Sequence, residues 1–239
     1  MINFRDLYTC AIINSLILLN YFFLPFNFEI LRITFVLLIF LIFISYVTYS
    51  FNKDFISKIF ILLIFIVCLG TPLNDWDGKY IWLFHAKRIF FDNDLYAQLD
   101  NYMPWTHNDY PPLIPSLSAS IANFFHIWND NLPKLSSAVM LSTMVIFINS
   151  LIQGNLAKVI FFSLFLWITE KTFLSGSVDD ILSSYTLCSS LIMYFLFFKE
   201  KYFLNNKKLL FLLSYIFFTL TTLIKNEGLV IIIVLFLSY

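Results

Sequence analysis

The chain has 239 residues and a formal net charge of zero, with 60% hydrophobic and only 13% charged side chains. Soluble domains have about 45–50% and about 25% of these two classes, so the composition excludes an ordinary soluble domain and indicates a membrane protein. The sequence has no basic stripe and no zinc or RNA-binding signature, which excludes a nucleic-acid-binding protein.

Long apolar runs without the polar face of a soluble amphipathic helix follow one another along the chain. A hydrocarbon core about 30 Å thick takes a helix of about 20 residues, and most of these runs meet or approach that length. The predicted spans are residues 7–26, 30–50, 56–72, 135–152, 157–174, 178–198, 209–224 and an unfinished 228–239. The sequence therefore predicts an all-α, polytopic transmembrane helical bundle of about 7–8 spans.

Residues 1–239 are expected to form a single transmembrane domain. No small-residue cleavage site follows the first apolar run, so that run is expected to be a retained helix rather than a signal peptide. The last run has only about 12 residues, which is short of a span. We therefore expect the chain to be truncated at its C-terminus.

One connection, residues 73–112, is long, polar and rich in Asp and Trp. Because loops place polar chemistry at a surface, we expect it to be an extracytoplasmic loop that contains the candidate active site. Within it, residues 78–91 are predicted to form an interfacial helix, since aromatic residues such as Trp82 suit the headgroup boundary. Residues 113–127 are apolar but short, and we interpret them as a partial or re-entrant helix.

The distribution of Lys and Arg predicts which ends of the spans face the cytoplasm, because cytoplasmic loops are enriched in these residues. The strongest basic cluster lies within residues 199–208, and Lys53 with Lys58 forms the next group. Arg5 agrees with a cytoplasmic N-terminus. These anchors set the predicted orientation of the bundle.

Counting spans from these anchors places residues 73–112, 170–178 and 225–228 on the outer side of the membrane. The count requires that the short segment after the long loop does not cross the membrane. Arg32 and Lys134 then lie on the outer side, against the rule.

Ionisable side chains at the ends of apolar runs mark three polar segments on that outer side: Asn74–Asp77, Ser177–Asp180 and Lys225–Gly228. Such groups are costly at membrane depth and are therefore functional candidates. Asp75 and Asp77 directly follow a span, where a carboxylate can accept a proton from an attacking hydroxyl. The alternative is that both acids only end the helix and solvate the loop.

Basic and acidic residues beside these segments are candidates for substrate binding. Lys87 and Arg88 suit a lipid phosphate through charge-assisted hydrogen bonds, or they simply snorkel toward the headgroups. His107 with Asp109 could bind a divalent metal ion, but two ligands at this spacing are weak evidence, and a structural turn is the favoured interpretation.

Three further charged residues have both a functional and a structural interpretation. Asp179 opens a span, where a carboxylate also complements the free N–H groups and the helix dipole. Lys225 and Glu227 pair with each other, or they orient a phosphate or a sugar hydroxyl.

Taken in chain order, these segments resemble the GT-C class of membrane glycosyltransferases. The similarity is to the group of protein O-mannosyltransferases, lipid A aminoarabinose transferases and RgtA/B/C/D-like proteins. Trp76–Tyr80 (WDGKY) stands where the family has an acidic motif after a span, and His107–Leu113 (HNDYPPL) is similar to its His-Pro-Asp-Tyr-Pro-Pro-Leu segment. Ser175–Asp179 is similar to a Gly-Tyr-Ala-Asp segment, and Lys225–Gly228 to another recurrent one. Gly78 replaces the family's second acid.

The resemblance implies a polyprenyl-phosphate sugar donor and an inverting transfer to a glycan, lipid or protein acceptor outside the cytoplasm. It also implies a multi-pass protein of the bacterial cytoplasmic membrane whose site faces the periplasm or exterior, with a divalent metal left open. By this resemblance, Asp77 is expected to be the general base, and Asp75 is the second candidate for that role. The substrate-binding candidates are Lys87, Arg88, His107, Asp109, Tyr110, Asp179, Lys225 and Glu227. The competing interpretations are a transporter or flippase-like protein and an inactive fragment.

Overall fold

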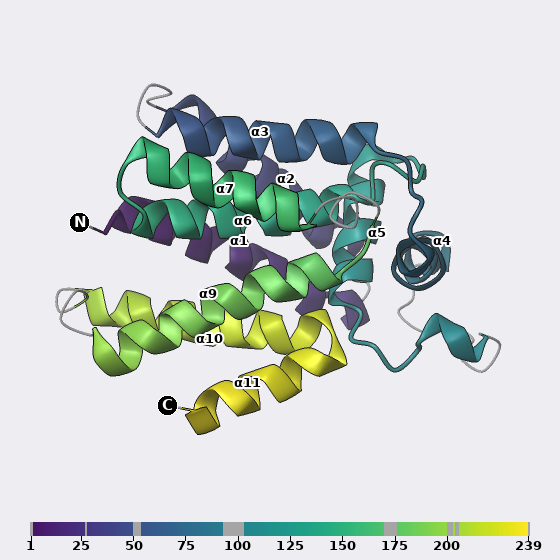
Figure 1. Ribbon diagram of the computed structural model, residues 1–239. Coiled ribbons are helices and arrows are strands. Elements are labelled where there is room, and N and C mark those ends of the chain that lie inside the picture. Colours follow the sequence, from purple (N-terminus) through teal and green to yellow (C-terminus); the bar gives the residue numbers. More distant parts are fainter. Residues whose placement is uncertain are drawn as a thin grey trace.

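The structure is a computed structural model, and it describes residues 2–26, 28–49, 54–92, 103–169, 176–199, 203 and 206–238. Every regular element in these residues is a helix (Figure 1). The predicted all-α fold is therefore confirmed for this part of the chain. The predictions that concern Lys53, residues 93–102 of the long loop, residues 170–175 and Lys201 lie outside the described residues.

The helices follow the predicted apolar runs closely. The first set is α1 (Phe4–Phe22), α2 (Glu29–Thr48), α3 (Phe55–Gly70), α4 (Leu83–Asp92) and α5 (Leu113–Phe125). The second set is α6 (Leu135–Leu151), α7 (Asn155–Thr169), α9 (Asp179–Phe198), α10 (Lys207–Ile224) and α11 (Asn226–Ser238). Short turns occupy Leu24–Phe26 (η1), Gly78–Trp82 (η2) and Pro104–Thr106 (η4).

Local chemistry explains where some boundaries differ from the predictions. The run predicted as 7–26 stops being α-helical at Phe22, and Pro25 follows within η1. Proline cannot donate a backbone hydrogen bond and ends a helix. The helix predicted over 78–91 is a π-helical turn, η2, that leads directly into α4. The interfacial segment therefore contains two kinds of helix.

The α5 helix is short and buried. Its 13 residues correspond to a length of about 20 Å, less than the thickness of a hydrocarbon core of about 30 Å. All residues from Leu113 to Asn123 are buried, so α5 packs on every side against the rest of the protein. This is the environment expected of a partial helix inside a bundle.

The long helices run between two opposite ends of the bundle, and they alternate in direction along the chain (Figure 1). At one end, the backbone N–H of Asn3 donates to the carbonyl of Ser150 (2.9 Å), and Lys158 pairs with Asp54 (2.8 Å). We call this the N-terminal end. The opposite end, here the acidic end, contains the chain after α3, the turn before α9 and the corner between α10 and α11.

A buried polar network fixes α1, α6 and α9 against one another in the core. The hydroxyl of Tyr185 donates to Oδ1 of Asn14 (2.5 Å) and lies 2.9 Å from the hydroxyl of Thr143. All three side chains are buried. Buried polar groups are costly unless they are hydrogen-bonded, so these contacts specify how the three helices meet.

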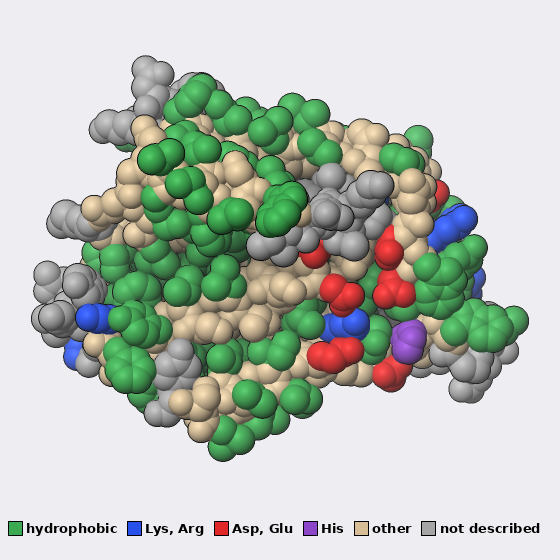
Figure 2. Space-filling view, in the orientation of Figure 1, with side chains coloured by type: hydrophobic (Ala, Val, Ile, Leu, Met, Phe, Trp, Pro, Cys, Tyr) green, Lys and Arg blue, Asp and Glu red, His purple; other side chains and the backbone are tan. Residues whose placement is uncertain are grey.

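Three of the helices, α2, α9 and α10, are long and apolar enough to cross a membrane. Large apolar side chains remain exposed on the outward faces of the bundle, among them Ile30 (83%) and Leu237 (82%). Figure 2 shows hydrophobic side chains over much of the surface and acidic side chains gathered at one end. Exposed apolar area of this kind indicates a membrane protein.

The two basic residues that break the positive-inside pattern are internal. Arg32 is 2% exposed, and its Nε and Nη2 donate to the hydroxyl of Ser120 on α5 (3.1 and 2.9 Å). Lys134 is also 2% exposed, and its ammonium donates to the carbonyl of Thr71, at the C-terminus of α3. A cation there complements the helix dipole. Both side chains make hydrogen bonds between helices inside the bundle. They therefore do not indicate which side of the membrane they lie on, as Lys and Arg in exposed loops do.

Candidate active site

The turn before α9 lies directly against the loop after α3. Gly176 has a positive φ of 99°, and a Cβ at this position would lie 2.7 Å from Leu73 and 3.3 Å from the Cα of Gly78. The positive φ favours glycine at this position, and the close approach to Gly78 leaves little room for a side chain. This contact places Asp179, at the start of α9, beside the segment that carries Asp77.

The corner between α10 and α11 contributes the only lysine of the three polar segments. Lys225 is extended (φ −157°, ψ 155°) and separates the two helices. Its ammonium donates to the Asp179 carboxylate at 2.9 Å and lies 3.6 Å from Glu227. Burial disfavours the charged ammonium, but the hydrogen bond and the carboxylates outweigh this and raise the pKa of Lys225.

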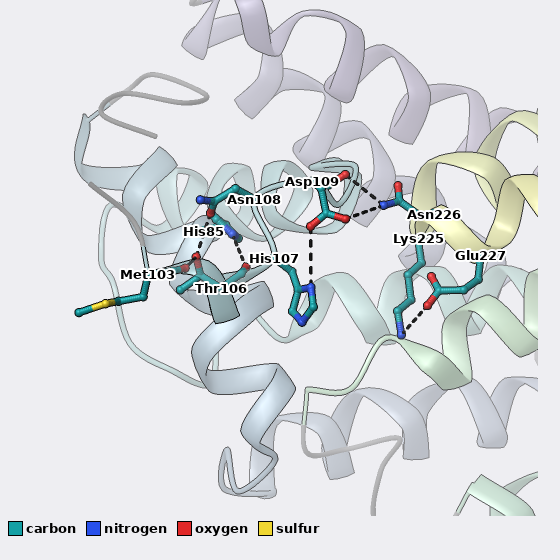
Figure 3. Close-up of polar contacts among 9 residues, drawn as sticks. All are labelled: His85, Met103, Thr106, His107, Asn108, Asp109, Lys225, Asn226 and Glu227. Atoms are coloured by element: carbon teal, nitrogen blue, oxygen red, sulfur yellow. Dashed lines mark hydrogen bonds and ion pairs between the residues drawn. The ribbon is translucent and has the colours of Figure 1, made fainter. Parts of the chain in front are cut away.

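The same corner holds the segment that precedes α5. The side-chain amide of Asn226 donates to the Asp109 carboxylate (2.9 Å) and to the Asp109 carbonyl (3.3 Å). Nδ1 of His107 lies 3.8 Å from the other carboxylate oxygen of Asp109 (Figure 3). Residues more than 110 positions apart in sequence thus share one cluster.

Tyr110 is the centre of an aromatic stack in this cluster. Its ring is nearly parallel to that of Trp82 (centroids 5.4 Å apart, 12°) and to that of His107 (4.8 Å, 9°). The Lys225 ammonium lies 5.4 Å from the Tyr110 ring centroid, within range of a cation–π contact. His107 has a positive φ of 51°, a strained conformation that occurs often at functional sites.

The two candidate bases have different surroundings. Oδ2 of Asp75 accepts a hydrogen bond from the backbone N–H of Gly78 (2.9 Å), so this carboxylate holds the turn after α3. Among the described residues, no group donates to the Asp77 carboxylate. Burial raises the pKa of Asp77, and the charges of Asp75 and Asp179 raise it further, whereas Lys225 and His107 lower it. The Asp77 carboxylate is therefore not tied to the turn as Asp75 is, and its surroundings favour proton uptake.

The acidic end has an excess of negative charge. The Lys225 ammonium contacts the carboxylates of Asp179 and Glu227 and acts on that of Asp77, while Asp75 and Asp109 add two further carboxylates to the cluster. Figure 2 shows this arrangement as acidic side chains around a basic one, with a histidine beside them. Such a site favours proton uptake and the binding of cationic or polar groups.

Not all predicted candidates belong to this cluster. Lys87 is exposed on α4, and Arg88, on the same helix, pairs with Asp92 at 2.9 Å. Neither side chain is among the groups that shift the pKa of Asp77. They lie on α4, outside the cluster.

Two residues of the cluster, Asn226 and Trp82, were not among the predicted site residues. Asn226 stands between Lys225 and Glu227, and this position in the polar segment is the sequence signal that could have identified it. Trp82 was predicted only as part of an interfacial helix, and the structure shows that its ring also stacks on that of Tyr110. In the described part of the chain, no group of three or more His, Cys, Asp or Glu residues is arranged to hold a metal ion.

A Lys225→Gln variant should have a still higher pKa at Asp77, because the substitution removes a cation that stabilises the Asp77 carboxylate. The measurement is a ¹³C NMR titration of aspartate-labelled protein in micelles, with the Asp77 signal assigned from its absence in Asp77→Asn. A pKa of Asp77 that is unchanged or lower in Lys225→Gln would show that the lysine does not act on this carboxylate.

Comparison of this chain with protein-family models, with curated proteins and with solved structures finds no match, so the assignment of the site depends on the residues and their geometry.

Proposed function

We propose that the protein is a membrane glycosyltransferase that moves a sugar from a polyprenyl-phosphate donor to an acceptor outside the cytoplasm. One observation carries the proposal: Asp77 lies in a cluster built from three polar segments that meet at one end of a helical bundle. The proposal includes a multi-pass chain of about 7–8 spans in the bacterial cytoplasmic membrane, with the acidic end facing the periplasm or exterior.

The proposed reaction is a single displacement with inversion at the anomeric carbon. The acceptor hydroxyl attacks that carbon while the bond from the carbon to the donor phosphate oxygen breaks. Asp77 takes the hydroxyl proton, and the polyprenyl phosphate leaves with the bonding electron pair. A positioned general base contributes typically about 10²–10⁴-fold to such a step.

The raised pKa of Asp77 supports its role as the base. A carboxylate with an ordinary pKa is a weak base at neutral pH, and raising its pKa increases the driving force for proton uptake. Burial and the neighbouring Asp75 and Asp179 charges act in this direction. Asp75 already holds the adjacent turn, which favours Asp77 over Asp75.

Lys225 is the cation that we place nearest the departing phosphate. Charge stabilisation in a partly dry site is commonly the largest catalytic contribution, and the Lys225 side chain is only 14% exposed. Lys87 and Arg88, on α4, are then suited to the phosphate of the arriving donor at the headgroup boundary. Asp109, His107 and Glu227 are left to orient sugar or acceptor hydroxyls.

A transfer assay tests the proposal directly. Membranes from cells that express the protein are supplied with radiolabelled hexosyl or pentosyl polyprenyl phosphates and with envelope acceptors. We expect label in an acceptor fraction that is absent from control membranes, with inverted anomeric configuration in the product. Label that stays on every donor tested, or a product of retained configuration, would contradict the proposal.

The pH dependence of the transfer rate should reveal the effect of neighbouring charges on Asp77. Transfer requires the deprotonated carboxylate, so the rate falls as the pH drops through the raised pKa of Asp77. In an Asp75→Asn variant, a negative charge that raises this pKa is removed, and the acidic limb of the pH–rate profile should move to lower pH. A limb that stays in place or moves to higher pH would remove Asp75 from the electrostatics of the base.

A cation-coupled transporter is the second candidate, and the excess of carboxylates over cations at the acidic end favours it. It predicts uptake of substrate into proteoliposomes that depends on a cation or proton gradient. The acids here lie at helix ends rather than midway along helices, which favours the enzyme. Gradient-driven uptake without any sugar transfer would reverse that preference.

A further inference from the structure

A second hollow lies at the N-terminal end of the bundle, away from the carboxylate cluster. It consists of two cavities that share the side chains of Arg5, Tyr46 and Tyr49. One cavity has a volume of about 320 Å³ and the other of about 210 Å³. Because they share three lining residues, they adjoin one another.

The larger cavity is a groove between α1 and α2. Its walls are mostly apolar and include Leu38, Leu41 and Ile42 of α2. Leu38 and Leu41 are large apolar side chains that remain exposed, so the groove opens on the outward surface of the bundle. A groove of this character accepts a hydrocarbon chain.

The smaller cavity is polar, and its carboxylates already have partners. Asp6 accepts a hydrogen bond from the side-chain amide of Asn149 (2.6 Å), and Asp54 pairs with Lys158 (2.8 Å). The cavity is also lined by Lys58, which is 2% exposed. Its ammonium donates to the carbonyl of Tyr49 (2.6 Å), which holds the positive charge at the wall of the cavity.

Arg5 stands where the two cavities join. Its guanidinium lies 4.1 Å from the centroid of the Tyr49 ring, which fixes the orientation of this cation. A planar guanidinium matches the oxygens of a phosphate group, which it binds through paired hydrogen bonds. A cation at the mouth of an apolar groove is the complement of a phosphate joined to a hydrocarbon chain.

We propose that this hollow binds an anionic glycerophospholipid, with the phosphate at Arg5 and one acyl chain in the groove between α1 and α2. Lys58 in the polar cavity adds a second positive charge near the headgroup. It disfavours the ammonium of a zwitterionic lipid, so we expect a preference for an anionic head. The proposal does not depend on the proposed transferase activity.

Native mass spectrometry of the full chain in detergent tests this proposal, with phosphatidylglycerol or phosphatidylcholine of identical acyl chains as the probe. One basic residue near a membrane surface contributes about 1 kcal/mol, which corresponds to an affinity difference of about fivefold. We expect phosphatidylglycerol to bind about fivefold more tightly than phosphatidylcholine because of Lys58, and Arg5→Gln to weaken both lipids, because both carry the phosphate. Equal binding of the two lipids by the unmodified protein would overturn the proposal.

Two further variants separate the parts of the site. Lys208→Gln removes an exposed cation from α10 at the same end and should leave the binding of both lipids unchanged. Ser45→Phe places a ring in the groove from an exposed position of α2 and should weaken both lipids. Binding that is weakened equally in Lys208→Gln and in Arg5→Gln, or undiminished binding in Ser45→Phe, would show that the hollow is not the lipid site.

Discussion

Asp77→Asn is expected to reduce sugar transfer by about 10²–10⁴-fold while the helical fold is retained. The amide has nearly the shape of the carboxylate but cannot take up the acceptor proton. Because no described group donates to the Asp77 carboxylate, the substitution breaks no hydrogen bond of the fold. The measurement compares initial transfer rates of membranes that contain equal amounts of each protein.

Asp130→Asn is the matched control for this experiment. Asp130 is exposed in the connection before α6, at the acidic end but outside the carboxylate cluster. It loses the same charge, so we expect transfer within about twofold of the unmodified protein, as for most surface substitutions. Transfer retained by Asp77→Asn, or lost equally in both variants, would remove Asp77 from the mechanism.

Gly228→Ala is expected to produce the largest loss of stability among the single substitutions considered. A Cβ at this position would lie 1.8 Å from the carbonyl oxygen of Thr221, so one of the two helices must move. Overpacking typically costs about 1–3 kcal/mol, which corresponds to a decrease in the melting temperature of about 2–12 °C for a chain of this size. The shift of α11 would also displace Lys225 and Asn226 from Asp179 and Asp109.

Thermal unfolding in detergent, followed by circular dichroism, measures this effect. Gly70→Ala is the control, since the same added methyl group at the end of α3 meets no atom within 4 Å. We expect the melting temperature of the control to remain within about 2 °C of the unmodified protein. Equal melting temperatures for both variants would show that α10 and α11 do not pack closely at Gly228.

Apolar runs predicted the helices well because a helix in hydrocarbon must satisfy its own backbone groups and present apolar side chains. The prediction of 135–152 lies within one residue of α6, and 178–198 lies within one residue of α9. The run 7–26 was too long because local backbone chemistry at Pro25, rather than hydropathy, ends the α-helix. The pattern of apolar and polar residues also could not distinguish a π-helical turn from an α-helix at Gly78–Trp82.

Counting helices between the basic clusters predicted that the three polar segments lie on one side of the membrane. The structure brings Asp77, Asp179 and Lys225 of these segments together. The individual contacts could not be predicted in this way. The bond from Asn226 to Asp109 and the stack of Trp82 on Tyr110 depend on how helices pack, which no local pattern encodes. Arg32 stood as an exception to the positive-inside rule in the prediction, because its burial is invisible in the sequence.

The central claim is that carboxylates from distant segments share one site on the side of the membrane away from the cytoplasm. Single cysteines at positions 77, 179 and 226, and a fourth at position 207, are treated with an impermeant maleimide in sealed right-side-out vesicles. We predict that positions 77, 179 and 226 react before lysis and that position 207 reacts only afterwards. Labelling of 77 and 179 from opposite sides would contradict the shared site and the transferase built on it.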